Sequence, residues 1–97
     1  MAFEIVLAPE AVEDLKRLRA GVRSGVVDAL EIHLRHEPQK VSRSRIKKLR
    51  GLRRPQYRLR VDDVRVFYDV SEDRVEVLAI VEKAEADTWL KRFGNPA

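Results

Sequence analysis

Apolar residues along the chain change from alternating to helical spacing and back again, and this order predicts a mixed domain. Alternation over residues 2–7 predicts a short strand. Apolar positions then recur at helical intervals in two stretches, which predict a helix from Pro9 to a stop at Gly21 and a second helix over about 22–36. Pro38 ends the second helix, and the two helices should form a hairpin with one apolar face.

After Pro55 the pattern returns to a period of two. It predicts three further strands, at residues 56–61, 64–70 and 75–81. Apolar residues at helical spacing over 84–93, followed by Gly94, predict a terminal helix. We therefore expect one α+β domain over residues 1–97. The N-terminal strand and helical hairpin should pack on a small antiparallel sheet of about four strands, with the terminal helix on the other face.

The turn formers Asp62-Asp63 predict the pairing of the first two strands of this meander. A two-residue hairpin loop at this point pairs Arg60 with Arg65 and Arg58 with Phe67. Because side chains alternate across a sheet, these four residues should share one face. The other face should be almost wholly apolar and meet the helices; it would carry Tyr57, Leu59, Val61, Val64, Val66, Tyr68, Val70, Val75, Val77, Ala79 and Val81.

A turn centred on Glu72-Asp73 would then pair Phe67 with Leu78 and Arg65 with Ile80. This register predicts an apolar patch on the arginine-bearing face. The terminal helix or a partner protein should cover that patch. The predicted patch consists of Phe67, Leu78, Ile80, Trp89, Leu90 and Phe93.

The net charge of +4 conceals a strong segregation. Residues 38–61 hold ten Lys or Arg and no acid, whereas the whole chain has 20 basic and 16 acidic side chains. The rest of the chain is therefore net acidic, and a polyanion should bind the basic segment. The simpler alternative is a solvated basic loop. The candidate RNA-binding residues are Arg45, Lys47, Lys48, Arg50, Arg53 and Arg54.

Arg58, Arg60 and Arg65 should continue this charge onto the sheet. Guanidinium groups suit phosphate because they present forked donors and stay protonated at neutral pH. On a rigid sheet they could hold a scissile phosphate and stabilise the extra charge of its transition state. The alternative is that each arginine pairs with an acid nearby, such as Asp69, Glu76 or Glu82.

Other classes of site are disfavoured. The chain has no cysteine, which excludes disulfides and cysteine-bound zinc. His33 and His36 have no evident third ligand, so we expect no metal and no cofactor. The chain has no membrane-length apolar run, and its first residues do not have the pattern of a signal peptide, so we expect a cytoplasmic protein.

The order of elements, together with three segments, resembles the RelE/ParE family of type II toxins, and most closely its RelE-like members. These segments are KKLRGL at 47–52, YRLRVDDVRVFYDV at 57–70 and RVEVLAIVEKAEADTWL at 74–90. The resemblance implies metal-independent cleavage of mRNA on the ribosome, by attack of a ribose 2′-hydroxyl on the adjacent phosphate. Arg58, Arg60 and Arg65 match the basic positions of the nuclease branch. The resemblance also implies a cognate antitoxin that forms a hetero-oligomer with the toxin and displaces or covers the last helix.

The segment EKAEADTWLKRFG after the last strand departs from the nuclease pattern, because it has no His or Tyr and no Arg before Arg92. Glu82, Lys83 and Glu85 stand where the family places its proton-transfer groups; a carboxylate can act as a base and a lysine can stabilise a phosphorane. Three functions stay open. They are a ribosome-dependent mRNA endonuclease that inhibits translation, a ParE-like inhibitor of DNA gyrase without nuclease activity, and a weakly active member that mainly binds antitoxin and operator DNA.

Overall fold

The computed structural model describes residues 2–97. Along the chain these residues form β1 (Glu4–Leu7), α1 (Pro9–Arg17), α2 (Ala20–Ala29), the π-helical turn η1 (Leu30–Leu34), β2 (Ile46–Lys48), β3 (Leu52–Arg54), β4 (Tyr57–Val61), β5 (Val64–Ser71), β6 (Arg74–Glu82), α3 (Lys83–Phe93) and β7 (Asn95–Pro96). None of the helices in this described part has the length and apolar character needed to cross a bilayer.

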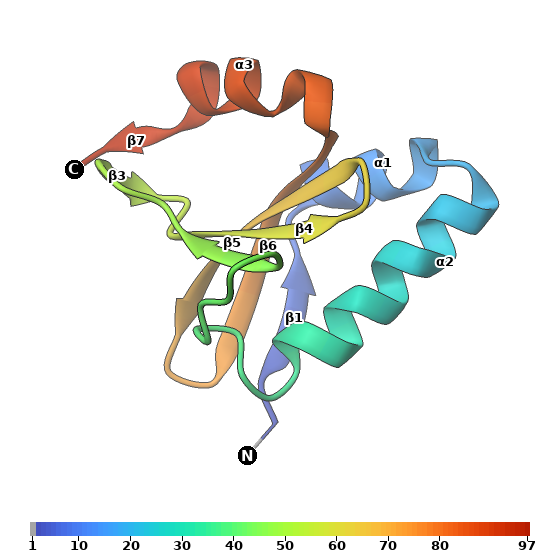
Figure 1. Cartoon of the computed structure of the whole chain (residues 1–97), viewed down its shortest axis with the longest axis horizontal. Helices are drawn as coiled ribbons and strands as arrows, with labels where there is room; N and C mark the ends of the chain where they lie inside the picture. The colour runs from blue at the N-terminus through green and yellow to red at the C-terminus, as the bar shows by residue number, and fades with distance from the viewer. Residues whose placement is uncertain (1) are drawn as a thin grey trace.

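The main sheet has five strands in the order β1-β6-β5-β4-β2. Strand β1 runs parallel to β6, and the other neighbours are antiparallel. The expected small antiparallel sheet of about four strands is thus a mixed sheet with one more strand. Helices α1 and α2 follow β1 and lead away from it (Figure 1), so no tight hairpin joins β1 to its neighbour and β1 can pair in parallel with β6. The additional strand is β2, at the other edge of the sheet.

The hairpin of β4 and β5 has the predicted register, with Val61 opposite Val64 and Arg60 opposite Arg65. The register of β5 and β6 starts as predicted, with Val70 opposite Val75, but shifts between Phe67 and Tyr68. A bulge inserts one residue into β6, so the pairs beyond it are displaced by one position.

Because of this bulge, the predicted position of Ile80 is wrong. Ile80 pairs with Val66 and belongs to the core on the side of α1 and α2, so it is not part of the patch under the terminal helix. Ala79 pairs with Phe67, and Val81 pairs with Arg65. Both therefore lie on the α3 face instead of the predicted core face.

The first helix of the hairpin, α1, is shorter at its C-terminal end than the sequence predicts. Helix α1 ends at Arg17, and Gly21 lies inside α2 instead of stopping the first helix. The guanidinium of Arg23 donates to the carbonyl oxygens of Leu15, Lys16 and Leu18, at 2.9–3.3 Å. A side chain from α2 thus satisfies the last carbonyls of α1, a role for which a glycine cap is then not needed.

The core between the helical hairpin and the sheet contains two stacked tyrosines. The rings of Tyr57 and Tyr68 are 5.5 Å apart between centroids, and both residues are buried, as predicted for that face. The Tyr68 hydroxyl donates to the carbonyl oxygen of Pro38 at 2.6 Å. This bond connects the segment that follows η1 to strand β5 in the middle of the sheet.

The basic segment, for which the sequence shows no clear period, forms two short strands on separate sheets. Strand β2 pairs with β4, and β3 pairs with the C-terminal strand β7. Figure 1 shows α3 on the opposite side of the sheet from α1 and α2, with β7 leading from α3 to β3. The predicted terminal helix and its end at Gly94 are confirmed.

Candidate nucleic-acid interface

A hollow of about 320 Å³ lies between the sheet and α3. We name it the arginine hollow. It is lined by Lys47, Leu49, Arg58, Arg65, Phe67, Lys83, Ala86, Asp87 and Leu90. Four of these side chains are cationic and one is acidic, so the lining of the hollow carries net positive charge.

Arg58 projects from the middle of β4 and is partly buried. Its Nε atom is buried and has no hydrogen-bond partner among residues 2–97. Burial lowers the pKa of Arg58, and the neighbouring positive charges of Arg65 and Arg60 lower it further. Arg58 is therefore a partly buried cation that forms none of the ion pairs within residues 2–97, and its buried Nε costs stability unless a ligand supplies an acceptor.

Among the described residues, Arg65 is the one charged residue that is buried, with 7% of its surface exposed. Its Nη1 donates to the carbonyl oxygens of Asp62 at 2.7 Å and Val64 at 3.1 Å. These bonds hold the guanidinium against the turn of the β4–β5 hairpin. Arg65 thus has a structural role as well as a place in the lining of the hollow.

Arg60 lies opposite Arg65 in the register but is exposed and does not line the hollow. Its backbone joins it to Arg45: the Arg60 N–H donates to the Arg45 carbonyl at 2.9 Å, and Arg45 Nη1 donates to the Arg60 carbonyl at 3.4 Å. The structure therefore brings Arg58 and Arg65 together in the hollow and leaves Arg60 outside it.

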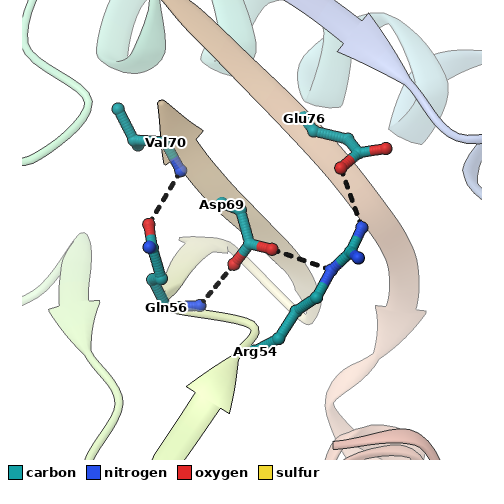
Figure 2. Close-up of polar contacts among 5 residues, drawn as sticks. All are labelled: Arg54, Gln56, Asp69, Val70 and Glu76. Carbon is teal, nitrogen blue, oxygen red and sulfur yellow. Dashed lines mark hydrogen bonds and ion pairs between the residues drawn. The ribbon is translucent and has the colours of Figure 1, made fainter. Parts of the chain in front are cut away.

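The alternative in which each arginine pairs with a nearby acid does not hold. Within residues 2–97, none of the ion pairs involves Arg58, Arg60 or Arg65. Asp69 and Glu76 both bind Arg54 instead, at 2.9 and 2.8 Å (Figure 2).

The predicted proton-transfer residues are split by the fold. Lys83 lines the arginine hollow. Glu82 lines a different hollow of about 580 Å³, beside the turn between α1 and α2, because the bulge in β6 places it opposite Val64. Glu85 is exposed and does not line the arginine hollow. Of these three candidates, Lys83 alone lines the arginine hollow, and a role in proton transfer stays a prediction for all three.

Sequence reasoning missed Asp87, the one acidic residue of the hollow. The available signal was helical spacing. Lys83, Asp87 and Leu90 lie at i, i+4 and i+7 of α3, so they share the face that meets the sheet.

The candidate RNA-binding residues lie in different environments. Lys47 on β2 lines the hollow. Lys48, Arg50 and Arg53 are exposed, as is Arg45. Arg54 is occupied by its two carboxylates. The segment therefore offers exposed positive charge that leads from the surface to the hollow at Lys47.

The predicted apolar patch is present apart from Ile80. The rings of Phe67 and Trp89 stack at 5.0 Å, and Phe93 follows Trp89 at 5.6 Å. Leu90 lines the arginine hollow, and Leu78 lines a hollow of about 450 Å³ beside Trp89 and Phe93. The described residues contain no group of three or more His, Asp or Glu side chains placed to hold a metal ion.

Solved structures of toxins share this fold. The chain has a TM-score of 0.70 and 23% identity to one chain of the archaeal RelE–RelB complex from Pyrococcus horikoshii, covering 86% of this chain and 97% of that one. It has a TM-score of 0.67 and 21% identity to the toxin–antitoxin complex RelBE2 from Mycobacterium tuberculosis, covering 84% and 99% of the two chains. A mutant of the E. coli toxin RelE in the free state gives a TM-score of 0.70 at 20% identity, covering 96% and 99%.

None of the curated proteins matches the chain. A family model does match, over residues 5–86, and its description is the ParE toxin of the type II toxin-antitoxin system parDE. The match extends from Ile5 in β1 into α3. It includes the main sheet except Glu4, both helices of the hairpin and the lining of the arginine hollow from Lys47 to Ala86. The chain therefore belongs to the ParE toxin family, within the RelE/ParE superfamily of type II toxins.

Proposed function

We propose that this toxin is a ribosome-dependent mRNA endonuclease that binds an RNA phosphate in the arginine hollow. The observation that carries the proposal is the buried, unpartnered Nε of Arg58. A phosphate oxygen in the hollow would accept that hydrogen bond and offset the charge that burial leaves uncompensated. The exposed basic residues of the segment before β4 would hold the flanking RNA backbone.

In the proposed reaction the ribose 2′-hydroxyl attacks the neighbouring phosphorus, and the bond from phosphorus to the 5′-oxygen breaks. The products are a 2′,3′-cyclic phosphate and a free 5′-hydroxyl. Asp87 is the carboxylate of the hollow and would take the proton of the 2′-hydroxyl, while Lys83 would give one to the leaving oxygen. Arg58 and Arg65 would stabilise the charge that builds on the phosphorane.

A second candidate function is inhibition of DNA gyrase. Two observations favour it: the lining of the hollow contains no His or Tyr, and the family model is that of ParE. In that case the arginine hollow would be part of a docking surface, with no covalent step. The two functions differ in their target, which is translated mRNA for the nuclease and DNA gyrase for the inhibitor.

The partner of this toxin is an antitoxin in either case, and we propose that the complex is a hetero-oligomer in the cytoplasm. Two solved structures with this fold are described as complexes of RelE with RelB. A net-positive toxin with a segregated basic segment would favour an acidic partner.

The test is induction of the wild-type protein and the variant Arg58→Met in bacteria, while labelled methionine and thymidine incorporation and mRNA 5′ ends are followed over the first minutes. Arg19→Met is the matched control, because Arg19 is an exposed arginine that lies outside both the hollow and the basic segment. The nuclease predicts rapid loss of methionine incorporation with new cuts in translated messages, abolished by Arg58→Met and retained by Arg19→Met. Intact messages with falling thymidine incorporation would assign the toxin to gyrase. No effect on either label would make antitoxin and operator binding its main activity.

A further inference from the structure

The last residues of the chain are hydrogen-bonded to the basic segment. Strand β7 pairs with β3, with Pro96 opposite Leu52 and Asn95 opposite Arg54. The N–H of Ala97 donates to the carbonyl oxygen of Gly51 at 3.0 Å. The C-terminal end of α3 is thereby attached to a strand that lies outside the main sheet.

Gly94 allows this close approach. A Cβ atom at this position would lie 2.5 Å from the carbonyl oxygen of Leu90 and 3.2 Å from Cδ2 of Leu52. The backbone conformation of Gly94 is an ordinary extended one, with φ at −68°, so space and not dihedral strain requires glycine. A side chain here would push the end of α3 away from β3.

Strand β3 is in turn anchored to the main sheet through Arg54. Its Nε lies 2.9 Å from Asp69 Oδ2 on β5, and its Nη2 lies 2.8 Å from Glu76 Oε1 on β6 (Figure 2). The carboxylate of Asp69 also accepts a hydrogen bond from the N–H of Gln56 at 2.7 Å, and the side-chain oxygen of Gln56 accepts one from Val70 at 2.9 Å. One forked cation thus joins β3 to two strands of the sheet.

Helix α3 has few other attachments. None of its residues is buried. Its first residue is held by the bond from the Lys83 N–H to the Asp63 carbonyl at 2.7 Å, and its middle by the stack of Trp89 on Phe67. The same helix supplies the wall of the arginine hollow that faces the sheet. Movement of its C-terminal end would therefore displace this wall and change the shape of the hollow.

We propose that β3 and β7 form a clasp that holds α3 over the arginine hollow, with Arg54 as the positioning residue of this clasp. Two short paired strands are marginal by themselves, so the clasp depends on the ion pairs of Arg54. Opening it would release the end of α3, widen the hollow and let water reach Arg58. The part of this inference that concerns RNA rests on the proposed function, but the attachment of α3 does not.

The attachment can be measured with Trp89, because it is the single tryptophan of the chain and stacks on the sheet. Quenching of its fluorescence by acrylamide, a neutral quencher, reports how well α3 is docked. The variants are Arg54→Met, Arg54→Lys and a chain that ends at Phe93; Arg53→Met, on the same strand, is the control. Far-UV circular dichroism identifies any variant that fails to fold.

We expect the quenching constant to rise about twofold or more in Arg54→Met and in the shortened chain, and to stay at the wild-type value in Arg53→Met. Arg54→Lys should give an intermediate value, because an ammonium is a single point charge and does not reproduce the forked contact with both acids. Wild-type quenching in both Arg54→Met and the folded shortened chain would overturn the clasp.

Binding of a short single-stranded RNA, followed at several salt concentrations, tests the effect on the hollow. Release of α3 should weaken binding by about threefold or more in both Arg54→Met and the shortened chain. The salt dependence of binding should fall less in the shortened chain than in Arg54→Met, because the shortened chain keeps every cation of the hollow and of the basic segment. Unchanged affinity with a released α3 would overturn the role of the clasp in the site. If instead wild-type protein binds the RNA no better than Arg58→Met does, the proposed function fails, whatever the fluorescence shows.

Discussion

The indole ring of Trp89 lies almost parallel to the phenyl ring of Phe67, with 5.0 Å between centroids and 5° between planes. Phe67 is fully buried at the centre of β5, whereas Trp89 belongs to a helix without a buried residue. This pair is therefore the main apolar link between α3 and the sheet.

Replacement of Trp89 by Ala should lower the free energy of unfolding by about 2–3 kcal/mol, since it removes a large apolar side chain and a stacked pair. Phe93→Ala is the matched control on the same helix. Phe93 is 55% exposed, so its loss should cost less than about 1 kcal/mol. Urea unfolding followed by circular dichroism measures both. Equal effects would show that the stack on Phe67 is not what holds the helix.

Replacement of Arg58 by Met should raise stability while it removes toxicity. The guanidinium is partly buried beside two like charges and has an unpartnered Nε, so an apolar side chain of similar length relieves a cost of about 0.5–1 kcal/mol. Thermal unfolding of the purified protein and growth after induction are the two measurements. A less stable variant would mean that Arg58 supports the fold. The unpartnered Nε of Arg58 would then no longer be evidence that the hollow binds an anion.

The stability of the protein should depend on pH through Asp69. Burial, the largest cause, raises its pKa above the ordinary value of 3.8, in spite of the hydrogen bond from Gln56 and the ion pair with Arg54. The folded state therefore binds this proton more tightly than the unfolded chain does. The contribution of Asp69 to stability is complete below pH 3.8 and falls as the pH rises through the folded-state pKa.

Asp69→Asn tests this dependence, because it keeps an oxygen that can accept from Gln56 and does not titrate. The stability of the wild type relative to this variant should fall as the pH is raised from about 4, and then become constant above the folded-state pKa. Urea unfolding between acid and neutral pH measures the difference. Glu85→Gln, at an exposed position of α3, is the control. A difference that rises with pH would reverse the assigned direction.

Removal of the Tyr68 hydroxyl should destabilise the protein by about 1–3 kcal/mol, since Tyr68→Phe leaves the carbonyl of Pro38 without its buried donor. Tyr57→Phe changes the other ring of the same stack and removes no hydrogen bond of this kind, so its effect should stay below about 0.5 kcal/mol. Chemical unfolding of the two variants side by side gives the comparison. A similar cost for both would place the effect in ring packing.

Local patterns predicted much of the fold. The turn at Asp62-Asp63 sets the register of β4 and β5, because a two-residue loop allows one pairing, and alternation then places Arg58 beside Phe67. The helical hairpin and the end of α3 at Gly94 were predicted in the same way, from the helical spacing of apolar residues and from residues that end helices. These features depend on residues that are close in the sequence.

Irregularities of strand pairing, and contacts between distant segments, could not be predicted by the same means. The bulge in β6 moved Ile80 to the core and Glu82 away from the hollow, and nothing near either residue in the sequence marks the insertion. Asp87 reached the hollow because α3 docks on Phe67, and Arg54 became an ion-pair anchor because β3 lies beside Asp69 and Glu76.

By itself, the sequence determined the kinds of element, the tight turns, the segregation of basic charge and the presence of Arg58 and Arg65 on one face. The tertiary structure alone decided that Asp69 and Glu76 pair with Arg54 and not with those arginines, which residues of α3 line the hollow and how the chain end is attached. The physical reason is range. Turn geometry and side-chain alternation act within a few residues, whereas burial, ion pairing and strand register between distant segments depend on how the whole chain packs.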